Sequence, residues 1–256
     1  MKVLAITQAR INSIRLPGKI FKDIEGQKII DIHIERVQKA TQIDKLILAT
    51  TYNPSDDILV SYLQEKNLIE IYRGSENNVL ERFYLAAKPY QPNYVVRLTS
   101  DCPLIDPHLI DEVISFAIKN KLEYCSNTLQ PMFPDGQDVE VFSFDSLEKA
   151  YFEATLDSEK EHVTPYILKN STYRNGKKFL SDNFLNTFGD YSKVRITLDE
   201  QNDFELLKKI IVQMGTNKTW KEYSDYIIKN KSVFNLNKHI NRNEGLNKSL
   251  LNDKNY

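Results

Sequence analysis

The sequence has few cysteines, and their arrangement excludes two kinds of small stabilised fold. Only Cys102 and Cys125 occur in 256 residues, and they form no C-x-x-C pair. Disulfide frameworks and structural zinc sites need several cysteines at defined spacings, so neither is expected here. Two unpaired cysteines in apolar surroundings favour a reduced compartment, and we expect a cytoplasmic protein.

Long apolar runs and an excess of one charge are also missing. The opening MKVLAITQAR is too short an apolar run for a secretory signal, and no later segment approaches the roughly 20 apolar residues of a membrane-spanning helix. Lys and Arg number 34 against 35 Asp and Glu, a formal net charge of −1. Such a chain has no general electrostatic footprint for nucleic acid. We therefore expect neither a membrane nor a nucleic acid as partner.

What the sequence does contain is an alternation of short β-branched runs with helical patterns. This alternation is typical of βαβ units and a parallel sheet. The expected strands are Val3–Thr7, Lys45–Thr51, Ile69–Arg73, Tyr94–Thr99, Glu123–Ser126 and Lys193–Leu198. Asn53 with Pro54, and Asp106 with Pro107, are typical of helix starts.

The alternation breaks in the middle of the chain. Pro131, Pro134 and Gly136 precede a two-residue alternation that ends at Phe144. We interpret this stretch as a small antiparallel excursion that extends the sheet or reaches a partner subunit. The pattern becomes helical and polar from residue 219 onward. We therefore expect one α/β domain over residues 1–215, with the excursion at about 130–144, and a helical C-terminal appendage over residues 216–256.

A basic loop follows the first expected strand, at the edge where open α/β sheets bind ligands. The phosphate motifs GxxxxGK[ST] and GxGxxG are both absent from the chain. Arg10 and Arg15 instead offer forked donors, Lys19 offers a mobile charge, and Ser13 offers a hydroxyl. Each cation about 4 Å from a phosphate oxygen contributes on the order of 4 kcal/mol of gross attraction at a surface-like dielectric. We interpret the loop as a triphosphate site rather than an ordinary solvated turn.

Two aspartates end expected strands. Asp101 follows the strand at 94–99, and Asp199 follows the one at 193–198. Nucleotidyl transfer needs a divalent cation, and magnesium takes one or two protein carboxylates together with phosphate and water oxygens. We therefore expect Asp101 and Asp199 to hold Mg²⁺, whereas Asp106 and Asp203 are interpreted as helix caps.

An ordered series of motifs resembles the spore-coat polysaccharide biosynthesis protein F group, which is similar to the CMP-ketodeoxyoctonate and CMP-acylneuraminate synthetases. The matching segments are QARINSIRLPGKIFKDIEGQKIIDIHIERV, IYRGSENNVLERF, RLTSDCPLIDP, FPDGQDVEVFSF, EHVTPYI and INRNEGLNKSL. The resemblance implies a Rossmann-like nucleotidyltransferase fold of three α/β/α layers, with CTP as donor, magnesium as cofactor and a homodimer. It implies phosphate binding by Arg10, Arg15 and Lys19 and metal binding by Asp101 and Asp199.

The resemblance also implies contacts to the nucleoside. Ala9 would lie near the base, and Arg73, Ser75 and Asn78 would lie near the base and ribose. Arg10, Lys19 and Asp101 would then act directly in catalysis.

The acceptor site is expected in the irregular middle of the chain, because the strand ends are already assigned. Asp135, Gln137, Asp138 and Glu140 lie around a turn, and His162 follows in a helical segment. Their functional interpretation is recognition of sugar hydroxyls or contact with a partner subunit. For the turn, a purely structural role is equally compatible; for His162, a packing or capping role is favoured.

The expected reaction is attack of an acceptor oxygen on the α-phosphorus of CTP, with release of pyrophosphate. The acceptor is an anionic sugar or sugar-like acid, and its attacking oxygen is an anomeric hydroxyl, a phosphate oxygen or a phosphonate oxygen. Alternatives are a sugar-phosphate or phosphonate nucleotidylyltransferase that uses another NTP, and an inactive nucleotide-binding scaffold. A metal-dependent glycosyltransferase is disfavoured because the segment Ser100–Pro103 contains no Asp-x-Asp pair.

Overall fold

A seven-stranded sheet organises the chain, as seen in a computed structural model that describes residues 1–253. The strand order is β5-β4-β1-β6-β8-β7-β9. Strands β1, β4, β5 and β6 are mutually parallel, whereas β8 runs antiparallel to its neighbours β6 and β7. The strands are β1 Val3–Gln8, β4 Lys45–Thr51, β5 Glu70–Gly74, β6 Tyr94–Thr99, β7 Tyr124–Ser126, β8 Glu140–Ser143 and β9 Ser181–Asn183, and the short pair β2 Asp23–Ile24 and β3 Gln27–Lys28 forms a separate hairpin.

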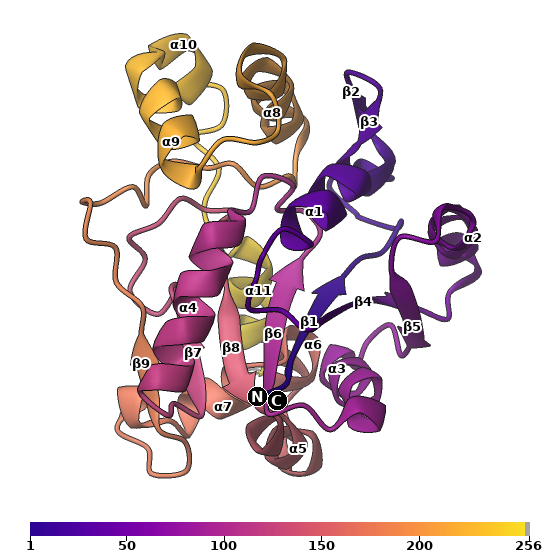
Figure 1. Cartoon of the computed structure of the whole chain (residues 1–256), viewed down its shortest axis with the longest axis vertical. Helices are drawn as coiled ribbons and strands as arrows, with labels where there is room; N and C mark the ends of the chain where they lie inside the picture. The colour runs from indigo at the N-terminus through magenta and orange to yellow at the C-terminus, as the bar shows by residue number, and fades with distance from the viewer. Residues whose placement is uncertain (254–256) are drawn as a thin grey trace.

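Helices cover both faces of the sheet, which confirms the expected three-layer α/β/α architecture (Figure 1). They are α1 Ile29–Val37, α2 Asp57–Lys66, α3 Val79–Ala87, α4 Pro107–Lys119, α5 Phe144–Glu153, α6 Asp157–His162, α7 Pro165–Lys169, α8 Gln201–Met214, α9 Trp220–Lys229, α10 Lys231–Phe234 and α11 Glu244–Asp253, with 3-10 turns η1 Lys19–Phe21, η2 Pro54–Asp56, η3 Lys88–Tyr90 and η4 Thr172–Arg174. Within residues 1–253, no helix combines the length and apolar character needed to cross a bilayer.

The two-residue period of β1 explains how both faces become buried. Val3 and Ala5 pack on the face that α4 covers, whereas Leu4 and Ile6 pack on the opposite face with α3 and α5. All four side chains are almost fully buried. A central parallel strand flanked by helices on both sides is a nearly continuous apolar run for this reason.

The helix starts expected from Asn-Pro and Asp-Pro pairs are confirmed. The Asn53 side chain accepts a hydrogen bond from the backbone N–H of Ser55 at the start of η2, 3.0 Å away. Asp106 accepts one from His108 at the start of α4, at 2.9 Å. Pro54 and Pro107 occupy first-turn positions that need no backbone donor.

Two expected elements differ in part or in full from the structure. The antiparallel character expected at 130–144 is confirmed by β8, but this strand lies inside the main sheet, between β6 and β7, and is no excursion from it. Residues 193–198 form no strand: they are paired with Asp135 by a single bridge, and the N–H of Leu198 donates to the carbonyl of Asp101 at 2.8 Å. These few backbone hydrogen bonds, to Asp135 and Asp101, hold residues 193–198 in an extended conformation without a continuous β-ladder.

Gly136 makes the approach of this stretch possible. Its φ is 103°, and an added Cβ would lie 2.7 Å from backbone atoms of Ile196 and Thr197. Only a residue without a side chain fits both the torsion angle and the space. The glycine therefore fixes the path of the chain immediately before Asp199.

The C-terminal part of the chain is helical and shares its core with the rest. Trp220 of α9 belongs to the apolar cluster beneath α4, and Tyr223 and Ile227 pack with α8. Helix α11 then crosses to α6 and lies behind the sheet in the view of Figure 1. The end of the expected appendage, residues 254–256, lies outside the described residues.

Candidate active site

The basic loop at the end of β1 is held in a defined turn. The N–H of Ile11 donates to Asp56 Oδ1 at 2.7 Å, and the N–H of Gly18 donates to the carbonyl of Ile11 at 3.1 Å. Gly18 has a φ of 67°, in the left-handed region that glycine adopts readily. Helix η1 begins directly after it, at Lys19.

Lys19 joins the two aspartates that the sequence singles out. Its Nζ lies 3.0 Å from Asp101 Oδ2 and 2.9 Å from Asp199 Oδ1. Burial alone would lower the pKa of Lys19, but the charges of Asp101 and Asp199 outweigh burial and raise it. For Asp101, burial acts to raise the pKa, and the opposing charge of Lys19 with a hydrogen bond from Thr99 lowers it below the usual range. The lysine is therefore charged and both acids are within its reach.

Arg15 and Arg195 hold Asp199 from two further directions. Arg15 Nη2 lies 2.9 Å from Asp199 Oδ1, and Arg195 Nη2 lies 3.0 Å from Asp199 Oδ2. Arg195 is buried and also pairs with Asp135 and Asp203. Burial opposes its charge, but these three carboxylates together raise the pKa of Arg195.

A cavity of about 810 Å³ opens beside the basic loop, and we call it the loop cavity. Of the residues expected to bind nucleotide, it is lined by Ala9, Arg10, Ser13, Arg15, Lys19 and Asn78. Arg82 of α3 lines it as well and was not foreseen. Burial, followed by the nearby charge of Arg10, lowers the pKa of Arg82 to about 10. Within residues 1–253 the Nε of Arg82 has no hydrogen-bond partner, so this cation has spare capacity for an anion.

A second cavity, of about 840 Å³, lies over β8 and α7, and we call it the central cavity. Asp135, Asp138, Glu140 and His162, the residues for which acceptor recognition was considered from the sequence, line it. Glu140 Oε1 accepts hydrogen bonds from the Tyr124 and Thr164 hydroxyls, at 2.8 and 2.6 Å.

Charges around the central cavity are balanced in pairs. Arg97 pairs with Glu140, and Arg242 pairs with Asp138. Burial first, and the charge of Asp138 second, raise the pKa of Asp135 to about 6 against the opposing effect of Arg195 and Arg242. These arginines were not foreseen, because nothing in their local sequence separates them from ordinary surface arginines.

The two cavities meet at the acidic pair. The residues that line both are Gln8, Arg15, Thr99, Asp101, His162, Asp199, Glu244 and Gly245. Among the described residues, the buried Oε1 of Gln8 has no hydrogen-bond partner. Because the two cavities share these lining residues, a ligand in one and a ligand in the other would contact each other beside Asp101 and Asp199.

The profile of the cytidylyltransferase family matches residues 4–240. The chain belongs to this family. The resemblance drawn from its motifs is thereby confirmed, and the chain is a CTP-dependent nucleotidyltransferase.

Three relatives illustrate the similarity of this cytidylyltransferase to known proteins. The spore coat polysaccharide biosynthesis protein SpsF of Bacillus subtilis is 30% identical over 219 residues, which are 83% of this chain and 88% of SpsF. The 3-deoxy-manno-octulosonate cytidylyltransferase of Chloroherpeton thalassium is 28% identical over 144 residues, 54% of this chain and 55% of that enzyme. The solved structure of a cytidylyltransferase from Leptospira borgpetersenii serovar Hardjo-bovis has a TM-score of 0.84 and 33% identity, and covers 91% of this chain and 97% of that one.

Three of the expected site residues of the cytidylyltransferase do not line either cavity. The Arg73 guanidinium bonds to the carbonyls of Thr51 and Asn53 and pairs with Asp57, so it braces the end of β4. Ser75 and Gln137 are likewise used within the fold.

The Ser75 hydroxyl accepts from the N–H of Asn78 at 3.1 Å and so shapes the turn before α3. Gln137 is fully buried, and its amide bonds to backbone groups of Asp106 and Leu104. Gln137 was expected to contact a ligand because it stands in a turn of polar residues. Its side chain is instead buried, and its amide forms hydrogen bonds with the backbone.

The chemistry of the acidic pair fits a hard divalent cation. Asp101 and Asp199 offer oxygens to one point, which Lys19 Nζ now contacts. Residues 1–253 contain no group of three or more His, Cys, Asp or Glu side chains arranged to hold a metal. Two carboxylates suit magnesium, which draws its other ligands from phosphate and water.

Cys102 lies beside this pair but is not activated. Burial, and then the charge of Asp101, raise the pKa of its thiol well above the usual value. A protonated thiol is a poor nucleophile.

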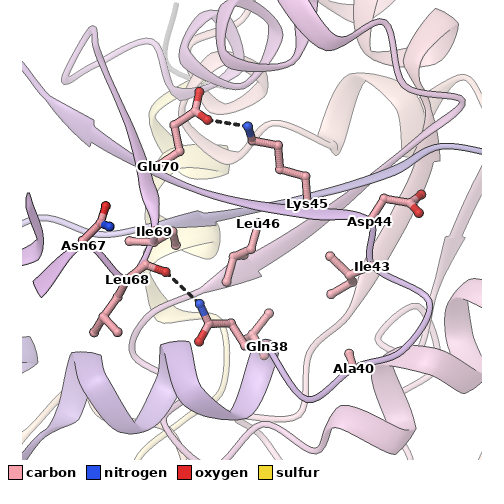
Figure 2. A pocket seen from close by; sticks show the side chains of 11 residues that line it. Gln38, Ala40, Ile43, Asp44, Lys45, Leu46, Asn67, Leu68, Ile69 and Glu70 are labelled. Atoms are coloured by element: carbon pink, nitrogen blue, oxygen red, sulfur yellow. Dashed lines mark hydrogen bonds and ion pairs between the residues drawn. The ribbon is translucent and has the colours of Figure 1, made fainter.

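A separate hollow of about 590 Å³ lies at the opposite, amino-terminal ends of β4 and β5 (Figure 2). Two pairs of its polar groups bond to each other: Lys45 with Glu70, and the Gln38 amide with the carbonyl of Leu68. This hollow contains no counterpart of the paired aspartates and cations, so the candidate site is the junction of the other two cavities.

Proposed function

We propose that this cytidylyltransferase transfers CMP from CTP to an anionic sugar acid and releases pyrophosphate, for the synthesis of a surface polysaccharide or glycoconjugate. The observation that carries the proposal is the junction of the loop cavity and the central cavity at Asp101 and Asp199. Two substrates that react with each other need adjoining sites with the charge-stabilising groups between them.

On the nucleotide side, the loop cavity would hold the triphosphate. Arg10, Arg15 and Lys19 would neutralise phosphate oxygens, and Ser13 would donate from its hydroxyl. Ala9 and Asn78 would lie along the nucleoside. Arg82 adds a buried cation with an unused donor. Forked guanidinium donors match phosphate oxygens in pairs, which supports this orientation.

On the acceptor side, the central cavity would orient the sugar acid. Asp135, Asp138, Glu140 and His162 line it together with Arg97, and their mixture of donors and acceptors suits hydroxyls and a carboxylate. An acceptor oxygen forms a bond to the α-phosphorus while the bond to the pyrophosphate oxygen breaks. Alignment of the two substrates and neutralisation of the departing charge would supply most of the rate.

Asp101 and Asp199 would hold the magnesium ion. When bound, such an ion neutralises phosphate charge and fixes the phosphate geometry. Lys19 contacts both carboxylates, and Arg15 and Arg195 contact Asp199, so these three cations orient the acidic pair.

The names of two relatives support the class of acceptor. One is a spore coat polysaccharide biosynthesis protein, and the other acts on 3-deoxy-manno-octulosonate. A cytoplasmic homodimer belongs to the same proposal, and light scattering of the purified chain tests the dimer.

The function is tested by pyrophosphate release from each NTP in turn, with Mg²⁺ and a panel of ulosonic acids, sugar phosphates and phosphonates. We expect release with CTP and an ulosonic acid. Release with a sugar phosphate or phosphonate would change the acceptor class, and equal turnover with UTP or GTP would contradict the proposal. Binding of CTP without turnover on any acceptor would indicate a nucleotide-binding scaffold.

A further inference from the structure

The C-terminal motif INRNEGLNKSL is not used by the reaction as described above, although α11 carries most of it. Arg242, two residues before α11, fixes the start of this segment. Its guanidinium pairs with Asp138 and donates a hydrogen bond to the carbonyl of Phe133 at 3.3 Å. The chain therefore enters α11 beside Asp138, which lines the central cavity.

Polar contacts hold α11 across the cleft. Glu244 Oε2 lies 3.5 Å from Arg15 Nη1 in the basic loop. Ser249 Oγ donates to Glu161 Oε2 at 2.7 Å and lies 3.1 Å from His162 Nε2 on α6. The helix thus links the amino-terminal loop to α6, two elements that lie far apart in the sequence.

No residue of α11 is buried. A helix held by a few exposed polar contacts contributes little to the core, and segments of this kind open locally at small cost. Its position is therefore better explained by the cleft that it covers than by the stability of the fold.

The faces of α11 match the two cavities. Lys248 lines the loop cavity, Leu246 and Leu250 line the central cavity, and Glu244 lines both. Arg15 is shared among the carboxylates of Asp199, Glu200 and Glu244 at 2.9, 4.0 and 3.5 Å. A triphosphate would have to draw Arg15 away from Glu244, whereas Lys248 would attract it.

We propose that α11 is a closing wall of the reaction cleft, with Lys248 as a contact to the polyphosphate of CTP and Glu244 as a competitor for Arg15. This inference rests on the proposed function. The two residues lie one helical turn apart and act with opposite sign: Lys248 strengthens nucleotide binding, and Glu244 weakens it by pairing with Arg15.

The test uses calorimetric binding of CTP with Mg²⁺ to the full chain and to two charge-neutral variants. Lys248→Gln is expected to raise the Kd about fivefold, the size of an exposed ion contact, and Glu244→Gln to lower it by a similar factor. At about 1 M salt, where the screening length is about 3 Å, both ratios should approach one. Lys231→Gln, on the exposed surface of α10, is the matched control and should bind like the wild type.

Amide exchange provides a second readout on the unmodified protein. Exchange of a peptide that spans residues 244–253 should slow at least about threefold when CTP and Mg²⁺ are added. Equal shifts of the same sign in both variants would indicate loss of helix structure rather than charge, and would overturn the inference. If the wild type binds CTP but neither variant changes the Kd and the exchange rate stays the same, the role of α11 is wrong and the proposed function stands. If the wild type does not bind CTP, the proposed function is wrong as well.

Discussion

The ammonium nitrogen of Lys19 lies 3.0 Å from a carboxylate oxygen of Asp101, although 82 positions separate them in the chain. The same nitrogen lies 2.9 Å from Asp199. One cation thus occupies the point where two acids converge, and a triphosphate entering the loop cavity offers it new partners. Release of the acids to a metal ion and capture of Lys19 by phosphate would then occur together.

Lys19→Gln is expected to lower kcat/KM for CTP by about a hundredfold. The variant removes a charge aimed at the site where phosphate charge develops, and losses of this size follow removal of a single stabilising group. Steady-state pyrophosphate release measures it. Lys231→Gln should keep wild-type kinetics, and a Lys19→Gln variant with less than a threefold loss would contradict the role.

Gly136→Ala is expected to destabilise the fold by about 3 kcal/mol, because it adds a steric clash to an unfavourable torsion angle. Urea unfolding measures the loss. Gly189 is a matched control: its φ is 111°, but an added Cβ would meet no atom within 4 Å. Gly189→Ala should cost about 1 kcal/mol from the torsion angle alone. If both variants lose the same free energy of unfolding, the close contact between Gly136 and the backbone of Ile196 does not contribute to the cost.

Arg195→Met is expected to cost about 3–5 kcal/mol of unfolding free energy. It leaves the buried Asp203 without its cation and leaves Asp135 only the more distant Arg242, 3.9 Å away, and an uncompensated buried charge is far more costly than a lost surface pair. Arg195→Lys should recover part of the loss. Arg174→Met, in the exposed turn η4, should change stability by less than about 0.5 kcal/mol.

His33 is expected to make the protein acid-sensitive. Burial lowers its pKa from 6.5 to about 4, and the ring bonds to Thr7 and to the carbonyl of Cys102. As the pH falls, the unfolded state therefore binds a proton on His33 before the folded state does. The stability that comes from the neutral, buried His33 is complete above pH 6.5 and is lost between pH 6.5 and about 4. Linkage gives about 1.4 kcal/mol per pH unit, or about 2 kcal/mol at pH 5.

Urea unfolding at pH 7.5 and pH 5 measures this effect. His33→Gln removes the titrating ring, so its stability should fall about 2 kcal/mol less than that of the wild type between the two pH values. Identical pH dependence in the two proteins would contradict the assignment to His33.

The parallel half of the sheet could be predicted from the sequence because its signals are local. Strands such as Lys45–Thr51 and Tyr94–Thr99 are short stretches rich in apolar and β-branched residues, and prolines and capping side chains mark the helices between them. The position of β8 could not be predicted, because an antiparallel strand between β6 and β7 depends on long-range pairing. The extended stretch before Asp199 resembles a strand in sequence, and only its neighbours decide that no ladder forms.

The candidate site divides in the same way. Arg10, Arg15 and Lys19 lie in a distinctive loop, and Asp101 and Asp199 follow stretches with a strand-like sequence, so local signals single them out. Arg82, Arg97 and Arg195 line the cavities, and Arg242 pairs with Asp138 at the edge of one; their places depend on burial and long-range pairing, which no local pattern reveals. Gln137 illustrates the opposite error: its place in a polar turn predicts ligand contact, but its side-chain amide hydrogen-bonds to backbone groups of the fold.

Pyrophosphate release by Asp101→Asn and Asp199→Asn, with CTP and the acceptor that the screen identifies, tests the central claim most directly. The two variants keep the size of the side chain and remove only the charge, and Asp145→Asn on the exposed start of α5 is the matched control. We predict a loss of about a hundredfold or more in each of the first two variants and wild-type turnover in the control. Turnover close to that of the wild type in either Asp101→Asn or Asp199→Asn would contradict a reaction centred on this pair.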